Sequence, residues 1–244
     1  MELDELRGRL DGIDEAMIAL LEQRMGVVED VARIKRVSGA PIYDEERERA
    51  VHSGRAAMVK NAAYAEYAHS LVCNLLASSR RLQRRLMNVY LIGMPGAGKT
   101  RLARAAAERT GLPIMDTDEL IETLSGRSIS GLFSDGEETF RRFECEALRR
   151  AAEAGGSIVA TGGGVIKLQS NVELMRQSGR VVFLDRALER LILEDHSMRP
   201  LISGAADVER LYEERYEAYR AAADFVLDPD DKNALDDLSA YCVE

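Results

Sequence analysis

The chain has 244 residues, of which 46% are hydrophobic, and carries a formal net charge of -9 with a pI near 5.1. This length is long for one small domain and comfortable for two. The acidic balance argues against nucleic acid or a membrane surface as a partner, because both are anionic and bind cationic faces.

The cysteines and the first residues favour a reducing, cytoplasmic setting. Cys73, Cys145 and Cys242 are odd in number, far apart and without a pairing or metal-ligand spacing, which predicts free thiols. Residues 1–5 show no cationic segment followed by an apolar run, and no stretch approaches the ~18 apolar residues of a membrane helix. We therefore expect a cytoplasmic protein.

The first third of the sequence carries an apolar stripe with three-four spacing, which predicts one very long helix ending at residues 38–41. The stripe skips one position, and Arg24 occupies it. A cation there is either paired internally or placed to meet an anionic ligand. The apolar positions are Leu3, Leu6, Leu10, Ile13, Met17, Leu20, Val27, Val31 and Ile34.

Two shorter helices follow the long one. Asp44 can N-cap a helix that runs from Glu45 to about residue 59, and a third helix runs from about residue 64 to 86. Residues 1–86 show no strand pattern, so we expect an all-α domain there. No Gly/Ser-rich or Pro-rich linker follows, and the third helix leads almost directly into the next domain at residue 87.

Polar side chains share faces of these helices, although each small group alone is typical of a solvated surface. Lys35 lies three turns after Arg24 on nearly the same face, about 16 Å away, so both cations could converge on one small dianion. Arg7 lies roughly 25 Å before Arg24 and about 100° round the helix. It could serve a partner's pocket in an antiparallel dimer. The shorter helices contribute Asp44, Arg47 and Glu48 on one face and Ser79 with Gln83 on another.

Together these positions resemble the all-helical class of chorismate mutases across residues 3–86. The resemblance implies an all-α three-helix domain in an intertwined homodimer that rearranges chorismate to prephenate. This intramolecular reaction needs a compact conformer, held by its carboxylates, and donors at the ether oxygen where negative charge develops. The resemblance implies that Arg7, Arg24, Lys35, Asp44, Arg47, Glu48, Ser79 and Gln83 bind chorismate, with Lys35, Glu48 and Gln83 catalytic.

The roles within that set also follow from the resemblance. Arg24, Arg47 and the partner's Arg7 would bind the carboxylates. Lys35 and Gln83 would face the ether oxygen. Glu48 and Asp44 would hold the ring hydroxyl or orient the cations.

From residue 88 the pattern changes to short apolar runs separated by helices, which predicts a parallel sheet covered on both faces. We expect an α/β domain over residues 87–244. Its five strands are predicted at residues 89–92, 114–115, 157–160, 181–184 and 225–227.

Residues 93–100, Gly-Met-Pro-Gly-Ala-Gly-Lys-Thr, stand between the first predicted strand and a helix, which is the context that a P-loop requires. Backbone N–H groups would converge on phosphate oxygens, Lys99 would reach the β/γ-phosphates, and the Thr100 hydroxyl would ligate Mg²⁺. The motif predicts ATP-type binding and does not name the acceptor. The expected ATP-binding residues are Gly93, Pro95, Gly96, Ala97, Gly98, Lys99 and Thr100.

Three further clusters could define the acceptor. Asp116-Thr117-Asp118 follows the second strand, at the edge where ligand crevices form, although a helix N-cap explains this pattern equally well. Residues 162–164 are three glycines that let a small ligand touch backbone or simply make a tight turn. Arg141 lies in a mostly apolar segment and Arg215 on a late helix over residues 207–222, where a lone Arg is usually solvated.

In this order the clusters resemble the shikimate kinase family, a P-loop kinase family, across residues 88–244. The resemblance implies that Asp118 binds and deprotonates the acceptor hydroxyl and that Asp116 supports Mg²⁺ beside Thr100. It also implies that Arg199, in a Met-Arg-Pro-Leu segment, is a lid arginine that closes on the transferring phosphoryl group. Leu191 and Ile192 depart from the pattern, where a further adenine-contacting Arg is expected. The implied shikimate-binding residues are Asp118, Arg141, Gly162, Gly163, Gly164 and Arg215, and Lys99, Asp118 and Arg199 are the implied catalytic set.

These observations predict a bifunctional chorismate mutase and shikimate kinase that uses ATP and Mg²⁺ and dimerises through its helical domain. Two alternatives stay open. The kinase could act on another small polyol or acid, such as gluconate. The helical part could instead be a non-catalytic dimerisation module that senses chorismate or prephenate, although donors at the ether oxygen, such as Lys35 and Gln83, are not needed for binding alone.

Overall fold

The computed structural model describes residues 2–194 and 204–243. Its internal contacts divide the chain into two compact units. The helical unit comprises Met1–Lys35 and Pro41–Arg84, and the α/β unit comprises Arg36–Ala40 and Arg85–Glu244.

The helical unit contains α1 (Leu3–Ser38), α2 (Glu45–Ala56) and α3 (Ala65–Arg85), the last preceded by a 3₁₀ turn over Ala62–Tyr64. The predicted N-cap is confirmed, because the Asp44 carboxylate accepts a hydrogen bond from the Arg47 backbone N–H at 2.9 Å. Helix α2 ends at residue 56 rather than near 59. The reason is local, since Asn61 caps the following 3₁₀ turn and the chain must leave the helix before it.

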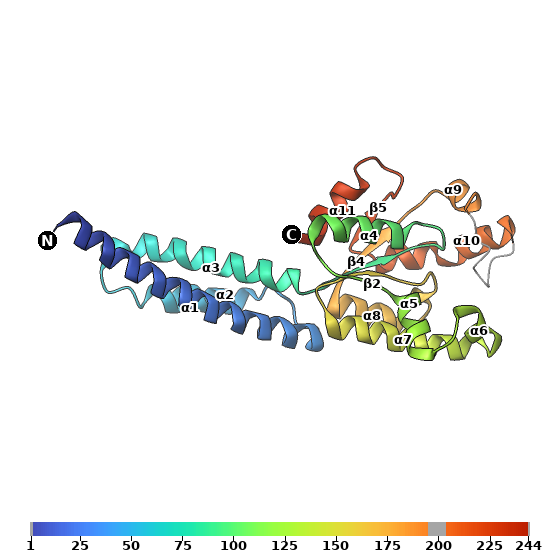
Figure 1. Cartoon of the computed structure of the whole chain (residues 1–244), viewed down its shortest axis with the longest axis horizontal. Coiled ribbons are helices and arrows are strands. Elements are labelled where there is room, and N and C mark those ends of the chain that lie inside the picture. Colours follow the sequence, from blue (N-terminus) through green and yellow to red (C-terminus); the bar gives the residue numbers. More distant parts are fainter. Residues whose placement is uncertain (1, 195–203, 244) are drawn as a thin grey trace. The chain divides into compact units, whose positions relative to one another are not determined.

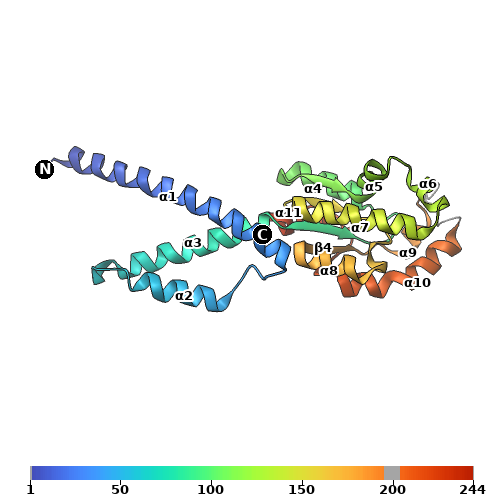
Figure 2. The same cartoon turned by 90° about the horizontal axis from the view of Figure 1, so that it is seen from below.

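All nine positions of the predicted stripe on α1 stay exposed within the chain. Leu10 is 59% exposed and Ile13 55%, and only Val28 and Ala32 of this helix are buried. Figure 2 shows the N-terminal half of α1 standing away from α2 and α3. Helices in water depend mainly on packing of their apolar face, so this stripe calls for a further surface to cover it.

The α/β unit is built on five parallel strands: β1 (Asn88–Ile92), β2 (Ile114–Asp116), β3 (Ile158–Ala160), β4 (Gly179–Leu184) and β5 (Phe225–Leu227). Their order in the sheet is β2-β3-β1-β4-β5, with β1 between β3 and β4. The predicted five-stranded parallel sheet is therefore confirmed.

Helices cover both faces of this sheet (Figure 1). Helices α4 (Lys99–Thr110) and α11 (Ala234–Val243) lie on one face, and α7 (Glu137–Ala154), α8 (Gln169–Ser178) and α10 (Ala205–Ala222) lie on the other. All five residues of β1 are buried, as expected for a strand with two covered faces. Shorter helices α5 (Thr117–Ser125), α6 (Ile129–Ser134) and α9 (Leu188–Ile192) complete the unit with the 3₁₀ turn Val165–Lys167. None of the described helices combines the length and apolar character needed to cross a membrane.

A buried amide joins the central strands to the helical layer. The Asn88 amide nitrogen donates to the Ala151 carbonyl at 2.8 Å and to the Tyr90 hydroxyl at 2.9 Å. The Asn88 side-chain oxygen accepts from the Ser157 backbone N–H at 3.0 Å, immediately before β3. Because buried polar groups need partners, these bonds fix the alignment of β1, β3 and α7.

Candidate active sites

A cavity of about 410 Å³ opens where the loops after β1, β2 and β3 meet. Parallel strands bring the loops at their carboxyl ends to one edge of the sheet, which is where such folds bind ligands. The cavity is lined by most of the residues predicted for the kinase site: Pro95, Gly96, Gly98, Lys99, Thr100, Asp116, Asp118, Arg141, Gly162, Gly163, Gly164 and Arg215. Gly93 and Ala97 belong to the same loop without lining the cavity.

The loop after β1 has the conformation that phosphate binding requires. Gly93, Gly96 and Gly98 have φ values of 146°, 90° and 81°, which side-chain-bearing residues rarely adopt. Helix α4 begins at Lys99, so its N-terminal N–H groups point into the loop. The Lys99 ammonium donates to the carbonyls of Gly93 at 2.9 Å and Met94 at 3.0 Å, which holds it over the loop.

Asp116 has both roles considered for the Asp-Thr-Asp segment, as a helix N-cap and as a ligand-site residue next to the P-loop. One carboxylate oxygen accepts from the Asp118 backbone N–H at 2.9 Å and so caps α5. The other accepts from the Thr100 hydroxyl at 2.7 Å. A hydroxyl and a carboxylate side by side at the P-loop are the oxygen donors that Mg²⁺ prefers, so Thr100 and Asp116 fit this ion.

The three glycines after β3 are needed because other site residues lie against them. A Cβ atom at Gly163 would lie 2.8 Å from Pro95 Cγ, and one at Gly162 would lie 3.0 Å from an Asp118 carboxylate oxygen. A Cβ at Gly164 would collide with the Arg141 guanidinium. The glycines thus let the P-loop, the carboxylate and the cation close around one cavity.

Arg141 enters the cavity wall between two carboxylates. Its guanidinium donates to Glu144 at 2.7 Å and to Glu137 at 2.8 Å. Hydrogen bonds from Arg141 and Lys167 lower the pKa of Glu137 to about 2. Burial raises the pKa of Glu144, against the opposing effect of Arg141. Its carboxyl group therefore sits in a dry part of the site, held mainly by one cation.

Arg215 is not solvated, contrary to what is usual for a single Arg on a helix. It is 3% exposed, and one of its terminal nitrogens donates to the Gly163 carbonyl at 3.0 Å. Tyr219 donates to the same carbonyl. Within the described residues the buried Arg215 Nε makes no hydrogen bond, and the Glu214 carboxylate lies 3.9 Å away. Because Arg215 lines the cavity, a polar ligand there could satisfy this buried donor.

Three predicted positions of the kinase site remain, namely the lid arginine Arg199 and the adenine-side residues Leu191 and Ile192. Arg199 lies outside the described residues. Leu191 is fully buried and Ile192 packs against the same core. These two side chains therefore contribute to the hydrophobic core at α9.

Among charged residues, the sequence analysis missed Arg101 and Glu144, which line the cavity, and Arg186, which contacts the P-loop. Glu144 lies three residues after Arg141 on α7 but was not assigned a role. Arg186 lies two residues after the end of β4, and its Nη1 donates to the Gly96 carbonyl of the P-loop at 2.8 Å and to the Glu194 carboxylate. Its Nε donates to Asp230. Its place just after a strand of the parallel sheet was the available signal.

The helical unit brings together three of its predicted residues. The Arg24 guanidinium donates to the Ser79 hydroxyl at 2.6 Å and to the Leu75 carbonyl at 3.3 Å. Gln83, 7% exposed, donates to the Ser79 carbonyl at 3.3 Å, and its buried side-chain oxygen makes no hydrogen bond in the described structure. Burial and the nearby Arg55 lower the pKa of Arg24. This cluster joins α1 to α3 and leaves a cation and an amide beside each other.

The other predicted residues of this unit have separate partners. Both oxygens of Glu48 accept from Arg80 at 2.5 Å, a partner that the sequence analysis did not identify. Lys35 donates to the carbonyls of Pro41 and Ile42 at 2.8 Å each. Arg7 pairs with Asp4 on its own helix at 3.1 Å, with 65% of its side chain exposed. Asp44 caps α2, and the Arg47 side chain is exposed.

Comparison with known protein families matches both units. The family model described as Shikimate kinase matches residues 95–243, and the model described as Chorismate mutase type II matches residues 6–84. A shikimate kinase of Clostridium beijerinckii is 40% identical over 141 residues, which cover 57% of this chain and 83% of that protein. One of Symbiobacterium thermophilum is 42% identical over 130 residues, or 51% of this chain and 75% of that protein.

Solved structures agree with the sequence matches. Shikimate kinase from Acinetobacter baumannii in complex with shikimate aligns with a TM-score of 0.59 at 32% identity, covering 65% of this chain and 91% of that chain. Shikimate kinase from Aquifex aeolicus aligns with a TM-score of 0.56 at 28% identity, covering 64% of this chain and 96% of that chain.

The contact of Arg186 with the P-loop generates a first prediction. Arg186→Gln should weaken binding of a non-hydrolysable ATP analogue roughly 10-fold, because a charge-assisted hydrogen bond to the loop is lost. Isothermal titration calorimetry measures this dissociation constant. Arg190→Gln changes a nearby exposed Arg and should leave it unaltered. Equal affinities for the wild type and Arg186→Gln would show that the loop holds its shape unaided.

Proposed function

The chain belongs to the shikimate kinase family and carries a chorismate mutase type II domain before it, and we propose that it is an enzyme with both activities. Residues 87–244 would transfer the γ-phosphate of ATP to shikimate, and residues 1–86 would rearrange chorismate to prephenate. Both substrates are small carboxylates, and each proposed site contains at least one partly buried guanidinium.

The observation that carries the kinase assignment is the pair of arginines beside the P-loop cavity. Arg141 and Arg215 are both withdrawn from solvent, and the buried Arg215 Nε lacks a hydrogen-bond partner among the described residues. A planar guanidinium binds a carboxylate bidentately. A substrate that carries a carboxylate therefore suits this wall. Asp118, in the first turn of α5, offers a carboxylate to take the proton of the substrate hydroxyl.

The proposed transfer needs little covalent chemistry from the protein. The acceptor hydroxyl oxygen attacks the γ-phosphorus, its proton passes to the Asp118 carboxylate, and the bond to the ADP oxygen breaks. Lys99 and the P-loop N–H groups stabilise the phosphate charge, and Arg199 would add to them. Thr100 and Asp116 would hold Mg²⁺, which neutralises charge on the phosphates when bound.

The mutase proposal rests on the Arg24, Ser79 and Gln83 cluster and on the exposed stripe of α1. Arg24 would bind a carboxylate, and Gln83 and Lys35 would donate to the ether oxygen as charge develops there. Helix α1 needs a second copy of itself to cover residues such as Leu10 and Ile13. In such a homodimer the partner's Arg7 would complete a pocket that Arg7 cannot reach in its own chain.

The decisive test assays the purified full chain for both reactions and removes one site at a time. Asp118→Asn should lower the kinase kcat by about 10²- to 10⁴-fold, as expected for loss of a general base, and leave the mutase rate unchanged. Lys99→Ala should act in the same direction. Glu119→Gln alters a neighbouring exposed carboxylate and serves as the control. Near-normal phosphorylation by Asp118→Asn would contradict the assigned role.

Acceptor recognition is tested by comparing two adjacent arginines. Arg141→Ala should lower kcat/KM for shikimate by roughly 10- to 10²-fold, because a charge-assisted pair with the carboxylate is lost. Arg142→Ala changes its exposed neighbour and should have little effect. The dissociation constant of an ATP analogue, measured in parallel, reports whether the rest of the site is intact. If both variants keep normal shikimate kinetics, Arg141 does not bind the substrate and pairs only with Glu137 and Glu144.

The shared mutase pocket is tested by subunit exchange. Arg7→Ala and Arg24→Ala chains should each be nearly inactive as mutases, because each homodimer lacks one cation in both pockets. A mixed dimer contains one doubly altered pocket and one intact pocket, so mutase activity should return on mixing. Kinase activity should stay constant throughout and serves as the control. If native mass spectrometry finds mixed dimers without mutase activity, the pocket is not shared between chains.

A further inference from the structure

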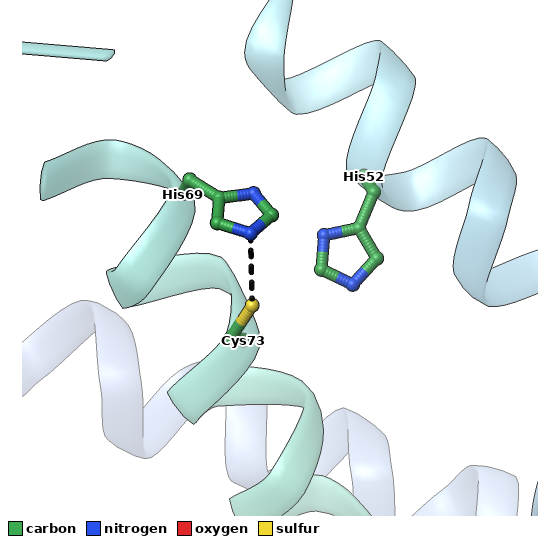
Figure 3. Close-up of side chains that lie close together, drawn as sticks. All are labelled: His52, His69 and Cys73. Atoms are coloured by element: carbon green, nitrogen blue, oxygen red, sulfur yellow. Dashed lines mark hydrogen bonds between the residues drawn. The ribbon is translucent and has the colours of Figure 1, made fainter. Parts of the chain in front are cut away.

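Helices α2 and α3 bring two histidines and a cysteine together on the helical unit. Ligand atoms of His52, His69 and Cys73 all lie within 4.8 Å of one another. His69 and Cys73 are one turn apart on α3, and His52 is on α2, as Figure 3 shows. This cluster has no part in either proposed reaction.

The spacing between the α3 pair matches that of two ligands on one metal ion. The Cys73 Sγ lies 3.6 Å from the His69 Nε2. Zinc–sulfur bonds of about 2.3 Å and zinc–nitrogen bonds of about 2.0–2.1 Å, set at a tetrahedral angle, also separate sulfur and nitrogen by about 3.6 Å. The two atoms, which share a hydrogen bond in the structure, are therefore spaced as two ligands of one ion would be.

The buried ring nitrogen of His52 is a second observation, independent of the α3 pair. Its Nδ1 is buried and, among the described residues, has no hydrogen-bond partner. The His52 and His69 rings lie 5.4 Å apart between centroids, and Figure 3 shows His52 presenting a ring nitrogen toward the other two side chains. A buried imidazole nitrogen left without a hydrogen bond is costly, and coordination of a metal would satisfy it.

We propose that His52, His69 and Cys73 form a Zn²⁺ site that cross-links α2 to α3. Two imidazoles and one thiolate are the donor set that selects tetrahedral Zn²⁺ over the oxygen-seeking Mg²⁺ and Ca²⁺. Three protein ligands leave the fourth position for water. His52 lies one turn beyond Glu48 on α2, so the ion stabilises the helix pair next to the Glu48–Arg80 ion pair.

Titration of the metal-free full chain with Co²⁺ tests this proposal, because Co²⁺ takes the geometry of Zn²⁺ and is coloured. Excess Mg²⁺ keeps the oxygen ligands of the kinase site occupied. We expect one Co²⁺ per chain, with the intense visible bands of a tetrahedral ion and a thiolate charge-transfer band, both abolished by added Zn²⁺. Zn²⁺ should also raise the thermal unfolding temperature of the helical unit, since it binds the folded state.

Matched variants assign the ligands. Cys73→Ser should abolish the thiolate band. His52→Ala or His69→Ala should weaken Co²⁺ binding by more than 100-fold, because loss of a group that only hydrogen-bonds to a metal ligand already costs roughly 10- to 100-fold. Cys145→Ser and His196→Ala remove another cysteine and the third histidine of the sequence and should bind as the wild type does. Circular dichroism of Cys73→Ser verifies folding. Absence of binding, an octahedral spectrum, or a thiolate band that survives Cys73→Ser would overturn the proposal. Because binding is read directly, this result is independent of both enzyme assays.

Discussion

The parallel pairing of β1 with β3 is the constraint on which the kinase site depends. It places the P-loop after β1 and the three glycines after β3 at the same edge of the sheet, although some seventy positions separate them in the sequence. The Asn88 amide holds this pairing from within, because its donors and acceptor are all satisfied by β1, α7 and the start of β3. A slip of one residue would turn every side chain of β1 to the wrong face and would separate Gly163 from Pro95.

The cavity beside the P-loop contains cationic side chains although the whole chain is acidic. The molecule carries a net charge of -9, yet three guanidiniums, those of Arg101, Arg141 and Arg215, line the cavity. Glu144 is an internal counter-charge for Arg141, and burial raises the pKa of Glu144 against the opposing effect of Arg141. One oxygen of Glu144 has no hydrogen-bond partner among the described residues. An acceptor with a carboxylate for Arg215 and hydroxyls for such oxygens would complete a network that the protein leaves partly open.

Local patterns in the sequence were enough to predict the strands and the long helix. They could not predict which side chains distant in the sequence would contact one another. Apolar runs predicted all five strands of the sheet, and the three-four stripe predicted α1 with nearly its observed ends. Asp116 shows why single motifs stay ambiguous, because its two oxygens perform the cap and the P-loop contact together. Arg80 and Arg186 were missed since their partners come from helices or loops distant in sequence.

Cys73 illustrates another limit of the sequence analysis. The spacing of Cys73 from the other cysteines gives no metal-ligand pattern. His69 stands four residues before it, on the same face of α3, and this was a visible signal. His52 could not be added from sequence, because only the packing of α2 on α3 brings it within reach.

The two units of the chain differ in whether one copy of the chain supplies all the residues of its proposed site. In the α/β unit the described residues of the proposed kinase site come from the loops at one sheet edge and from helices α4, α5, α7 and α10 of the same chain, so the proposed site needs no second copy. The helical unit has one long helix and two shorter ones, and these leave the N-terminal half of α1 uncovered. If a second copy covers it, as proposed, burial of leucines and isoleucines supplies the association energy, and the same contact delivers the partner's Arg7. Mutase activity then follows the dimer equilibrium and depends on protein concentration, whereas kinase activity per chain does not.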